Sequence, residues 1–244
     1  MKLMTLNIWQ GRLEKVLLQH LETLNLDFAC TQEAVDCHGD SAGLVTPYQK
    51  IGKSLGLSEQ YFSPLIHVKL GNKDINFGNA LYGNVHFTKT ETVFTRGEYR
   101  ENFDLDADDY NIRAFQHAEF DIDGKQLHLL NHHGHHINAH KLGDDETLKQ
   151  VKQIANYIDQ LDGAVILCGD FNLSPNSESI KILDKTLINL SASNSLLTTR
   201  SKLTSKDEVC DYIFINDKVK INDFSMDETI ISDHNALLLD FELH

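Results

Sequence analysis

Residues 164–173 of this chain read AVILCGDFNL. The unbroken apolar run 164–168 predicts a fully buried strand, and Gly169 predicts the turn that ends it. That turn lifts Asp170 and Asn172 out at the edge of the sheet, while Phe171 points back to the core. A carboxylate that orients water or binds metal would then lie beside an amide that donates to a phosphoryl oxygen.

Other apolar runs of the sequence also end in acid, amide or imidazole groups. They are LNIWQG with Asn7, TQE with Glu33, NHHGHH with His132 and His133, and SDHN with Asp233 and His234. One carboxylate at a strand end is common and needs no functional explanation. Several strands that all end in such groups predict one metal-assisted cleft that handles phosphate.

Periodicity and turn residues predict a mixture of hairpins and helical crossovers. Strands are expected over 3–9, 27–33, 61–70, 79–87, 114–122, 125–131, 164–168, 209–215 and 236–243, and helices over 13–24, 147–161 and 177–190. Asp123-Gly124 is the strongest hairpin signal, and Ser177 or Asn176 is the expected N-cap of the last helix. The acidic stretch 95–112 is expected to be a solvated loop. This order favours an α/β sandwich over a purely parallel sheet.

Length and composition favour one soluble domain. The chain has 244 residues, of which 41% are hydrophobic, and we expect residues 1–244 to form a single domain. No apolar run reaches the roughly 18 residues of a membrane span, and the N-terminal residues lack a signal-peptide pattern, so no stable membrane association is expected. The net charge of -14 disfavours loose adhesion to nucleic acid.

The cysteines favour a reducing compartment. Cys30, Cys37, Cys168 and Cys210 show no CxxC spacing, and three of them lie in apolar, strand-like runs. Free cysteine in such runs behaves as a small buried hydrophobe, so we expect a cytoplasmic location.

The ordered set LNIWQG, TQE, GNALYGN, NHHG, GDFNL, CDYIFI and SDHNALLL spans nearly the whole chain and resembles the endonuclease/exonuclease/phosphatase family. GDFN followed later by SDH is the most specific part. The resemblance implies a deoxyribonuclease I-like fold, a four-layer α/β sandwich of two packed mixed β-sheets flanked by helices. It also implies Mg²⁺-dependent hydrolysis of phosphoesters, in which Mn²⁺ is an expected substitute.

Glu33 is the expected metal ligand, because a hard divalent ion prefers carboxylate oxygen. The resemblance implies the same role. Asn7, at the neighbouring strand end, would bind metal or phosphate oxygen through its amide, and Asp233 would lie toward the metal.

The resemblance also assigns the catalytic groups. It gives Asp170 the water-activating role and Asn172 a contact to the transition state. His234 resembles the terminal catalytic histidine, and Asp211 in CDYIFI resembles the aspartate that hydrogen-bonds to it. A carboxylate on one ring nitrogen fixes the tautomer and raises the basicity of the other nitrogen.

His133 aligns with a histidine that contacts phosphate or protonates the leaving group, and Arg113 resembles a phosphate-contacting arginine. A guanidinium fork suits that task, although a loop arginine is also common on surfaces. At the end of GNALYGN, Asn84 stands where the family often has arginine, which weakens any expectation of a polyanion along that edge.

The leading interpretation is therefore a metal-dependent phosphoester hydrolase: a nuclease, a phosphodiesterase or a phosphatase. Its partner would be a phosphoester substrate, either a small molecule or a nucleic acid, and the oligomeric state stays open. Two alternatives come from other classes. One is a non-catalytic binding protein on the same fold, and the other is a transition-metal-binding protein centred on the histidines of NHHGHH.

Overall fold

The computed structural model describes residues 1–37, 45–71 and 73–244. In chain order the elements are β1 (Lys2–Asn7), the 3-10 helix η1 (Trp9–Gly11), α1 (Glu14–Leu21), β2 (Phe28–Cys37), α2 (Tyr48–Leu55), β3 (Glu59–Leu70), β4 (Lys73–Gly83), β5 (Lys89–Arg96), β6 (Arg113–Ile122), β7 (Lys125–His133), α3 (Asp145–Ile158), β8 (Ala164–Asp170), α4 (Glu178–Leu183), β9 (Ile188–Asn189), α5 (Leu190–Ser193), β10 (Asp211–Ile215), β11 (Val219–Asp227) and β12 (Ala236–Leu243).

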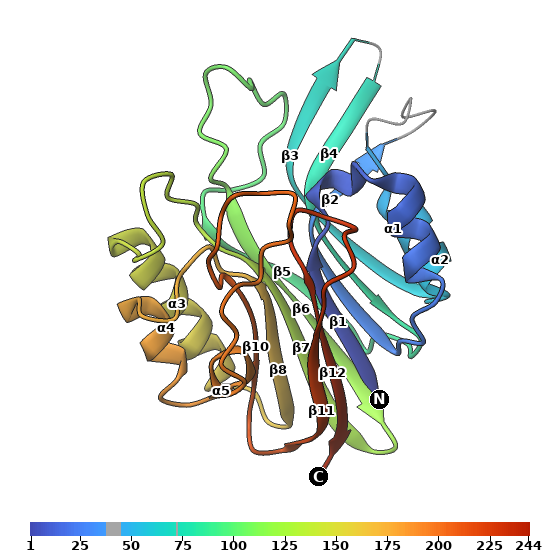
Figure 1. The fold of residues 1–244 in the computed structure, drawn as a ribbon, viewed down its shortest axis with the longest axis vertical. Coiled ribbons are helices and arrows are strands. Elements are labelled where there is room, and N and C mark those ends of the chain that lie inside the picture. The colour runs from blue at the N-terminus through green and yellow to red at the C-terminus, as the bar shows by residue number, and fades with distance from the viewer. Residues whose placement is uncertain (38–44, 72) are drawn as a thin grey trace.

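These strands form two packed, mixed sheets of six strands each. The strand order is β11-β12-β1-β2-β4-β3 in the first sheet and β5-β6-β7-β8-β10-β9 in the second. In Figure 1 the helices α1 and α2 flank one side of the strands, and α3 and α4 flank the other. The predicted four-layer α/β sandwich is thereby confirmed.

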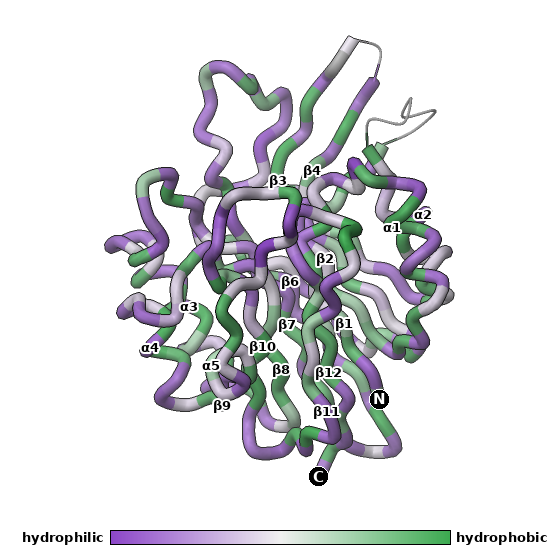
Figure 2. The backbone as a smooth tube through the Cα atoms, viewed as in Figure 1, coloured by the Kyte–Doolittle hydropathy of each residue, from purple (hydrophilic) through white to green (hydrophobic). Residues whose placement is uncertain are grey.

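Three apolar layers hold the four structural layers together. Phe28, Phe120 and Phe241 pack within the layer between the two sheets. Leu17 and Leu21 of α1 help to cover the outer face of the first sheet, and α3 covers the second. Figure 2 shows hydrophobic, green segments along the inner strands and hydrophilic, purple segments in many of the surrounding loops. Burial on both faces explains why runs such as AVILC are continuously apolar.

Most of the expected elements are present. The hairpin turn lies at Asp123 and Gly124, which both have positive φ, and the helix expected over 147–161 is α3. Asp144 caps α3 in a capping box with Thr147. Residues 38–44 and residue 72 lie outside the described residues.

The helix expected over 177–190 is wrong. Ser177 does cap a helix, but α4 ends at Leu183, and the chain then forms β9 against β10. Asn189 caps the short helix α5 by accepting a hydrogen bond from the amide of Ala192. Leu187 and Leu190 are buried at helix-like spacing, so the apolar pattern reports their burial rather than one continuous helix.

The solvated loop expected over 95–112 is present from residue 97 to residue 112 and is mostly exposed, but it departs from the expectation at a few residues. Residues 95 and 96 belong to β5, and Phe103 and Ile112 are buried in a small apolar cluster beneath the loop. The acidic groups of this loop pair locally, as in the contact of Arg96 with Asp109 at 2.7 Å.

A polar network crosses the central layer. The amide of Asn131, on β7, accepts from Gln32 on β2 at 2.7 Å and donates to the backbone oxygens of Thr31 and Ala80 at 3.1 Å. These bonds fix the two sheets against each other next to the strand ends that carry the polar motifs.

All four cysteines are free thiols, as expected. Among the described residues, no helix is both long enough and apolar enough to cross a membrane.

Candidate active site

The sheet registers bring the predicted polar motifs to one edge of the sandwich. Asn7 at the end of β1 is level with Gln32 on the parallel strand β2, beside Glu33. In the second sheet, Asp170 at the end of β8 is level with His133 on β7 and with Asp211 on β10. The parallel pairs β1–β2 and β7–β8 place their carboxyl ends together, whereas Asp211 lies at the start of β10, which runs antiparallel to β8.

A cavity of about 580 Å³ opens at this edge. Most of the expected site residues line it, namely Glu33, Arg113, His133, Asp170, Asn172, Asp233 and His234. Asn7 and Asp211 are buried directly behind the cavity wall, in contact with residues that line it. Three further cations, Arg12, Arg200 and Lys206, also line the cavity.

One amide joins the two central carboxylates. The side-chain nitrogen of Asn7 donates to Glu33 at 3.1 Å and to Asp170 at 3.2 Å. Its oxygen accepts from the backbone amide of Trp9, and Gln10 donates to the other oxygen of Glu33 at 2.9 Å. The two sheets therefore contribute carboxylates to a single hydrogen-bonded group.

Asp170 is ionised although it is buried. Burial by itself would raise the pKa of this carboxyl, but the neighbouring His234, His133 and Arg200 hold its pKa well below the usual range. The backbone amide of Asn172 also donates to Asp170 at 2.8 Å. A buried carboxylate held in its charged form can accept a proton or a hydrogen bond from water.

His234 and Asp211 form the expected pair. The Nδ1 atom of His234 lies 2.8 Å from Asp211, and Asp211 also accepts from the hydroxyl of Thr199 at 2.5 Å. Burial disfavours the imidazolium, yet Asp211 and Asp170 outweigh it and raise the pKa of His234 well above its ordinary value. The other ring nitrogen points into the cavity, where it contacts Arg200 and lies 3.7 Å from Asp170.

The residues of NHHGHH do not converge on one point. His132 packs edge-on against Phe171 in the core, whereas His133 lies 3.9 Å from Asp170. His135 lies near Asp144, and His136 bonds to Asn172 at 2.9 Å. Among the described residues, the groups whose ligand atoms come together exclude these four imidazoles, so the alternative of a metal site centred on NHHGHH receives no support.

Arg113 is anchored by the backbone. Its Nε donates to the carbonyl of Gly134 at 2.6 Å, and its Nη1 donates to those of Tyr110 and Ile112. Burial lowers the pKa of Arg113 to about 10, which still leaves it charged at neutral pH. This residue belongs to the cavity wall rather than to an exposed loop.

Backbone strain concentrates at the cavity. Trp9, Gln10, Glu33 and Asn172 line it and all have positive φ, between 49° and 58°. Glu33 sits at an irregularity in the β2–β4 register between Thr31 and Ala34. Non-glycine residues in this conformation cost free energy and are typical of functional sites.

Some residues that line the cavity or contact its lining were not predicted from the sequence. Arg200 contacts His234 and lies 3.5 Å from Asp233, and Lys141 donates to the side-chain oxygen of Asn172 at 2.7 Å. Both residues lie in loop sequences without a motif. Gln10 is part of the quoted LNIWQG segment, and its side-chain amide was the available signal.

Comparisons with known proteins agree with this geometry. Residues 4–234 match the family model described as Endonuclease/Exonuclease/phosphatase family. No curated protein matched the chain. Among solved structures, an endonuclease/exonuclease/phosphatase family protein from Leptotrichia buccalis is 18% identical, with 100% of both chains covered and a TM-score of 0.73.

Two other similar structures have more specific descriptions. A mannosyl-6-phosphatase from Bacteroides thetaiotaomicron is 13% identical, with 100% of both chains covered and a TM-score of 0.70. The human Nocturnin catalytic domain with bound sulfate is 17% identical, covering 100% of this chain and 94% of that one, with a TM-score of 0.71. At these identities the likeness establishes the shared fold.

Proposed function

Because this chain belongs to the endonuclease/exonuclease/phosphatase family, we propose that it is a Mg²⁺-dependent hydrolase of phosphoester bonds, for which Mn²⁺ can substitute. The observation that carries the proposal is the buried, ionised Asp170, which lies between the Glu33–Asn7 group and the imidazole of His234. Asp170 thus has the proposed metal ligand Glu33 on one side and the proposed acid-base group His234 on the other.

The residues present fit a hard divalent cation. Glu33 and Asp233 offer carboxylate oxygens on the cavity wall, and Asn7, whose amide nitrogen now faces Glu33, would offer its amide oxygen after rotation of its side chain. Oxygen donors of this kind are those that Mg²⁺ prefers, usually with several waters retained. When bound, the ion would polarise the phosphoryl group and neutralise part of its charge.

The remaining steps belong to side chains of the protein. Asp170 accepts a hydrogen bond from the attacking water and orients it in line with the leaving group. His234, which Asp211 holds in one orientation, donates its cavity-facing N–H to a phosphoryl oxygen as charge develops there. Asn172, His133 and Arg113 border the same space and would contact the phosphate or the departing oxygen.

The cavity favours a small substrate or a single-stranded end. Its volume of about 580 Å³ falls in the range of small-molecule sites. The structurally similar Bacteroides protein carries the name mannosyl-6-phosphatase, which is consistent with a small phosphorylated substrate for this fold. With the free cysteines, we propose a cytoplasmic enzyme without stable membrane association.

Turnover of a substrate panel with metal and with chelator tests the proposal. The panel comprises DNA, RNA, a small phosphodiester, phosphomonoesters and a lipid headgroup, each with Mg²⁺, Mn²⁺ or chelator. We expect hydrolysis of at least one substrate that needs added metal. Glu33→Gln should remove most of that activity and weaken Mg²⁺ affinity by calorimetry, whereas the control Glu59→Gln, at a surface Glu–His pair, should not. A properly folded protein that binds phosphoesters and cleaves none would favour the non-catalytic alternative.

A further inference from the structure

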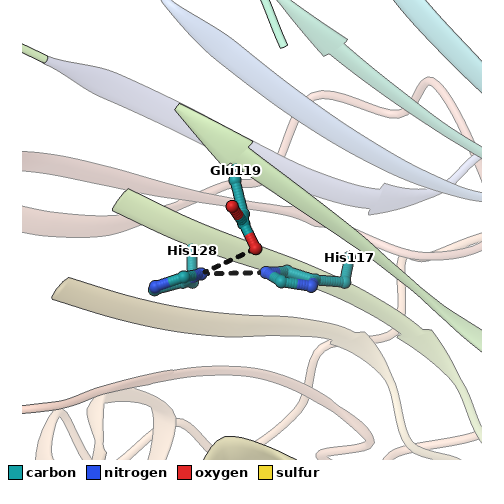
Figure 3. Close-up of side chains that lie close together, drawn as sticks. All are labelled: His117, Glu119 and His128. Atoms are coloured by element: carbon teal, nitrogen blue, oxygen red, sulfur yellow. Dashed lines mark hydrogen bonds and ion pairs between the residues drawn. The ribbon is translucent and has the colours of Figure 1, made fainter. Parts of the chain in front are cut away.

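A second group of ligand-type side chains lies on β6 and β7, apart from the candidate active site. His117 and Glu119 alternate with inward residues on β6, so they share the sheet face that α3 covers. His128 on β7 is the cross-strand partner of Glu119. Figure 3 shows the three side chains pointing toward one another.

The three ligand atoms converge. The Nε2 atom of His117 lies 3.0 Å from the Nδ1 atom of His128, and that Nδ1 atom lies 4.0 Å from the Oε1 atom of Glu119. One atom from each residue lies within 4.8 Å of the other two. Both histidines are almost completely buried, whereas Glu119 is partly exposed and leaves a path to solvent.

The outer hydrogen bonds of the two rings determine which nitrogens carry protons. The Nε2 atom of His128 lies 3.0 Å from the backbone oxygen of Asp162, so that nitrogen must be the donor. The hydroxyl of Tyr157 donates to Glu91 at 2.9 Å, so its oxygen accepts from the Nδ1 atom of His117 at 2.7 Å. In neutral rings, the two inner nitrogens are then both lone-pair acceptors.

Two lone pairs 3.0 Å apart repel unless a cation lies between them. We propose that His117, His128 and Glu119 form a binding site for a divalent transition metal of the zinc type. Histidine ligands of metals commonly donate their second N–H to a carbonyl or another polar oxygen, which is the arrangement of both rings here.

The donor set selects the class of metal. Two imidazoles and one carboxylate suit zinc and its first-row neighbours, whereas Mg²⁺ prefers oxygen alone. Ligands about 2.0–2.1 Å from a tetrahedral ion lie about 3.3 Å apart, so small rotations of the side chains are sufficient. Gln126 donates to the second oxygen of Glu119 at 3.2 Å and helps to orient it.

One cation competes for the carboxylate. Lys89 lies 3.7 Å from the Oε1 atom of Glu119, the oxygen that would bind the metal. The Lys89 side chain is half exposed and also lies near Glu91, so it can shift toward Glu91 without leaving its charge unpaired. Displacing Lys89 from Glu119 would therefore cost little of the free energy of metal binding.

The site is separate from the proposed catalytic centre. His128 precedes His133 on β7 by roughly 16 Å of strand. A bound ion would link the β6–β7 hairpin, through Tyr157, to the end of α3 and, through Asp162, to the segment before β8. We therefore assign the site a stabilising role, and this inference does not depend on the proposed hydrolase activity.

Metal titration of the full chain in excess Mg²⁺ tests the inference. The excess Mg²⁺ fills sites made of oxygen donors, so that binding of added Co²⁺ or Zn²⁺ is then detected at sites that contain nitrogen ligands. We expect one tightly bound ion in the wild type, a visible Co²⁺ spectrum of imidazole ligation, and a higher Tm with Zn²⁺. The Glu33→Gln variant should bind the same ion, because Glu33 lies in the other site.

Variants separate ligation from mere folding. His117→Gln, His128→Gln and Glu119→Gln should each lose the tight ion. Tyr157→Phe, a milder change, should weaken binding about 10- to 100-fold by removing the acceptor that orients His117. His20→Gln, at a histidine–aspartate pair elsewhere in the fold, is the control and should bind normally. The inference would be overturned by a wild type that binds neither Co²⁺ nor Zn²⁺. It would also be overturned if the Glu119→Gln variant bound the ion with the same affinity as the Tyr157→Phe variant.

Discussion

His234 lies between the carboxylate of Asp211, which orients the ring, and the positively charged side chain of Arg200. Asp211 holds one ring nitrogen at 2.8 Å, while Arg200 contacts the other. Phosphate binding would offer Arg200 an anionic partner and free the imidazole N–H for a phosphoryl oxygen. The geometry thus suits a histidine that becomes active when substrate enters.

The histidine–aspartate pair can be tested by a double-mutant cycle. We expect His234→Ala and Asp170→Asn each to lower turnover roughly 10²- to 10⁴-fold, the scale of one acid-base or electrostatic group. Asp211→Asn should cost less, because Asp211 acts through His234. Steady-state kinetics of the double variant is the decisive measurement: a further large loss when Asp211→Asn is added to His234→Ala would show that the two do not act as a pair.

The sequence predicted the candidate site residues, but it did not predict the loop residues that contact them. The candidate site residues lie in or directly behind one cavity, because each lies at or near one end of a strand whose apolar pattern is readable. Arg200 and Lys141 come from loops, and loop sequence does not reveal which side chain folds back toward a strand end. Their roles became apparent only from their contacts with His234 and Asn172.

Among the elements, β2 contains the clearest functional distortion. The strand would carry Glu33 away from the cavity if its pleat were regular, since neighbouring side chains alternate between faces. The register irregularity and the φ of 53° at Glu33 reset that alternation. The distortion costs stability and places the carboxylate.

Two substitutions at Glu33 separate the cost of that distortion from the effect of the charge. Glu33→Gly and Glu33→Ala both remove the carboxylate, and we expect both to lack metal-dependent activity. The glycine variant should be more stable than the alanine variant by about 1 kcal/mol, because only glycine adopts positive φ without strain. Urea denaturation gives the comparison. Equal stability of the two variants would mean that the bulge relaxes when the carboxylate is removed.

The strands that were not predicted from the sequence are sheet edges. β5 and β11 are edge strands with few buried side chains, so their sequences lack the alternating or continuous apolar pattern of the inner strands. The inner strands were predicted because they are buried on both faces. The wrong helix over 177–190 has the opposite cause, since buried residues kept a helical spacing across a break in the backbone.

At the scale of the whole molecule, buried histidine makes stability depend on pH. Burial, with the charge of Arg113, lowers the pKa of His132 from 6.5 to about 3. Between pH 6.5 and pH 3 the unfolded chain therefore binds a proton at His132 that the folded chain does not bind. The free energy of unfolding is unaffected by this proton above pH 6.5, and it decreases as the pH falls from 6.5 toward 3.

Comparing wild type with His132→Leu tests this dependence. Between pH 6.5 and 5 the wild type should lose about 2 kcal/mol that the variant does not lose. Denaturant unfolding at both pH values measures the difference, with His140→Leu at an exposed position as the control. Parallel pH profiles for wild type and His132→Leu would contradict the assignment.

The charge of the whole chain bears on its substrate. At a net charge of -14, the protein has few places to neutralise a long row of phosphates. We expect duplex DNA to be a poor substrate relative to a small phosphoester, and catalytic efficiency to change little with salt. Each phosphate contacted would add about 0.9 to the salt exponent for duplex DNA. Cleavage of matched duplex, single-stranded and small substrates across salt concentrations measures it, and efficient duplex cutting with a steep slope would contradict the expectation.

The pairing of β1 with β12 also shapes how the chain reaches its fold. Met1 bonds to Phe241, which is 240 positions away, and β12 separates β1 from β11 in the first sheet. Such a high contact order slows folding, because the entropy of closing the loop is lost before the pairing compensates for it. Until residues 236–243 arrive, the unpaired edge of β1 is open to strands of other molecules. Aggregation during refolding should therefore compete most strongly before this last long-range pairing forms.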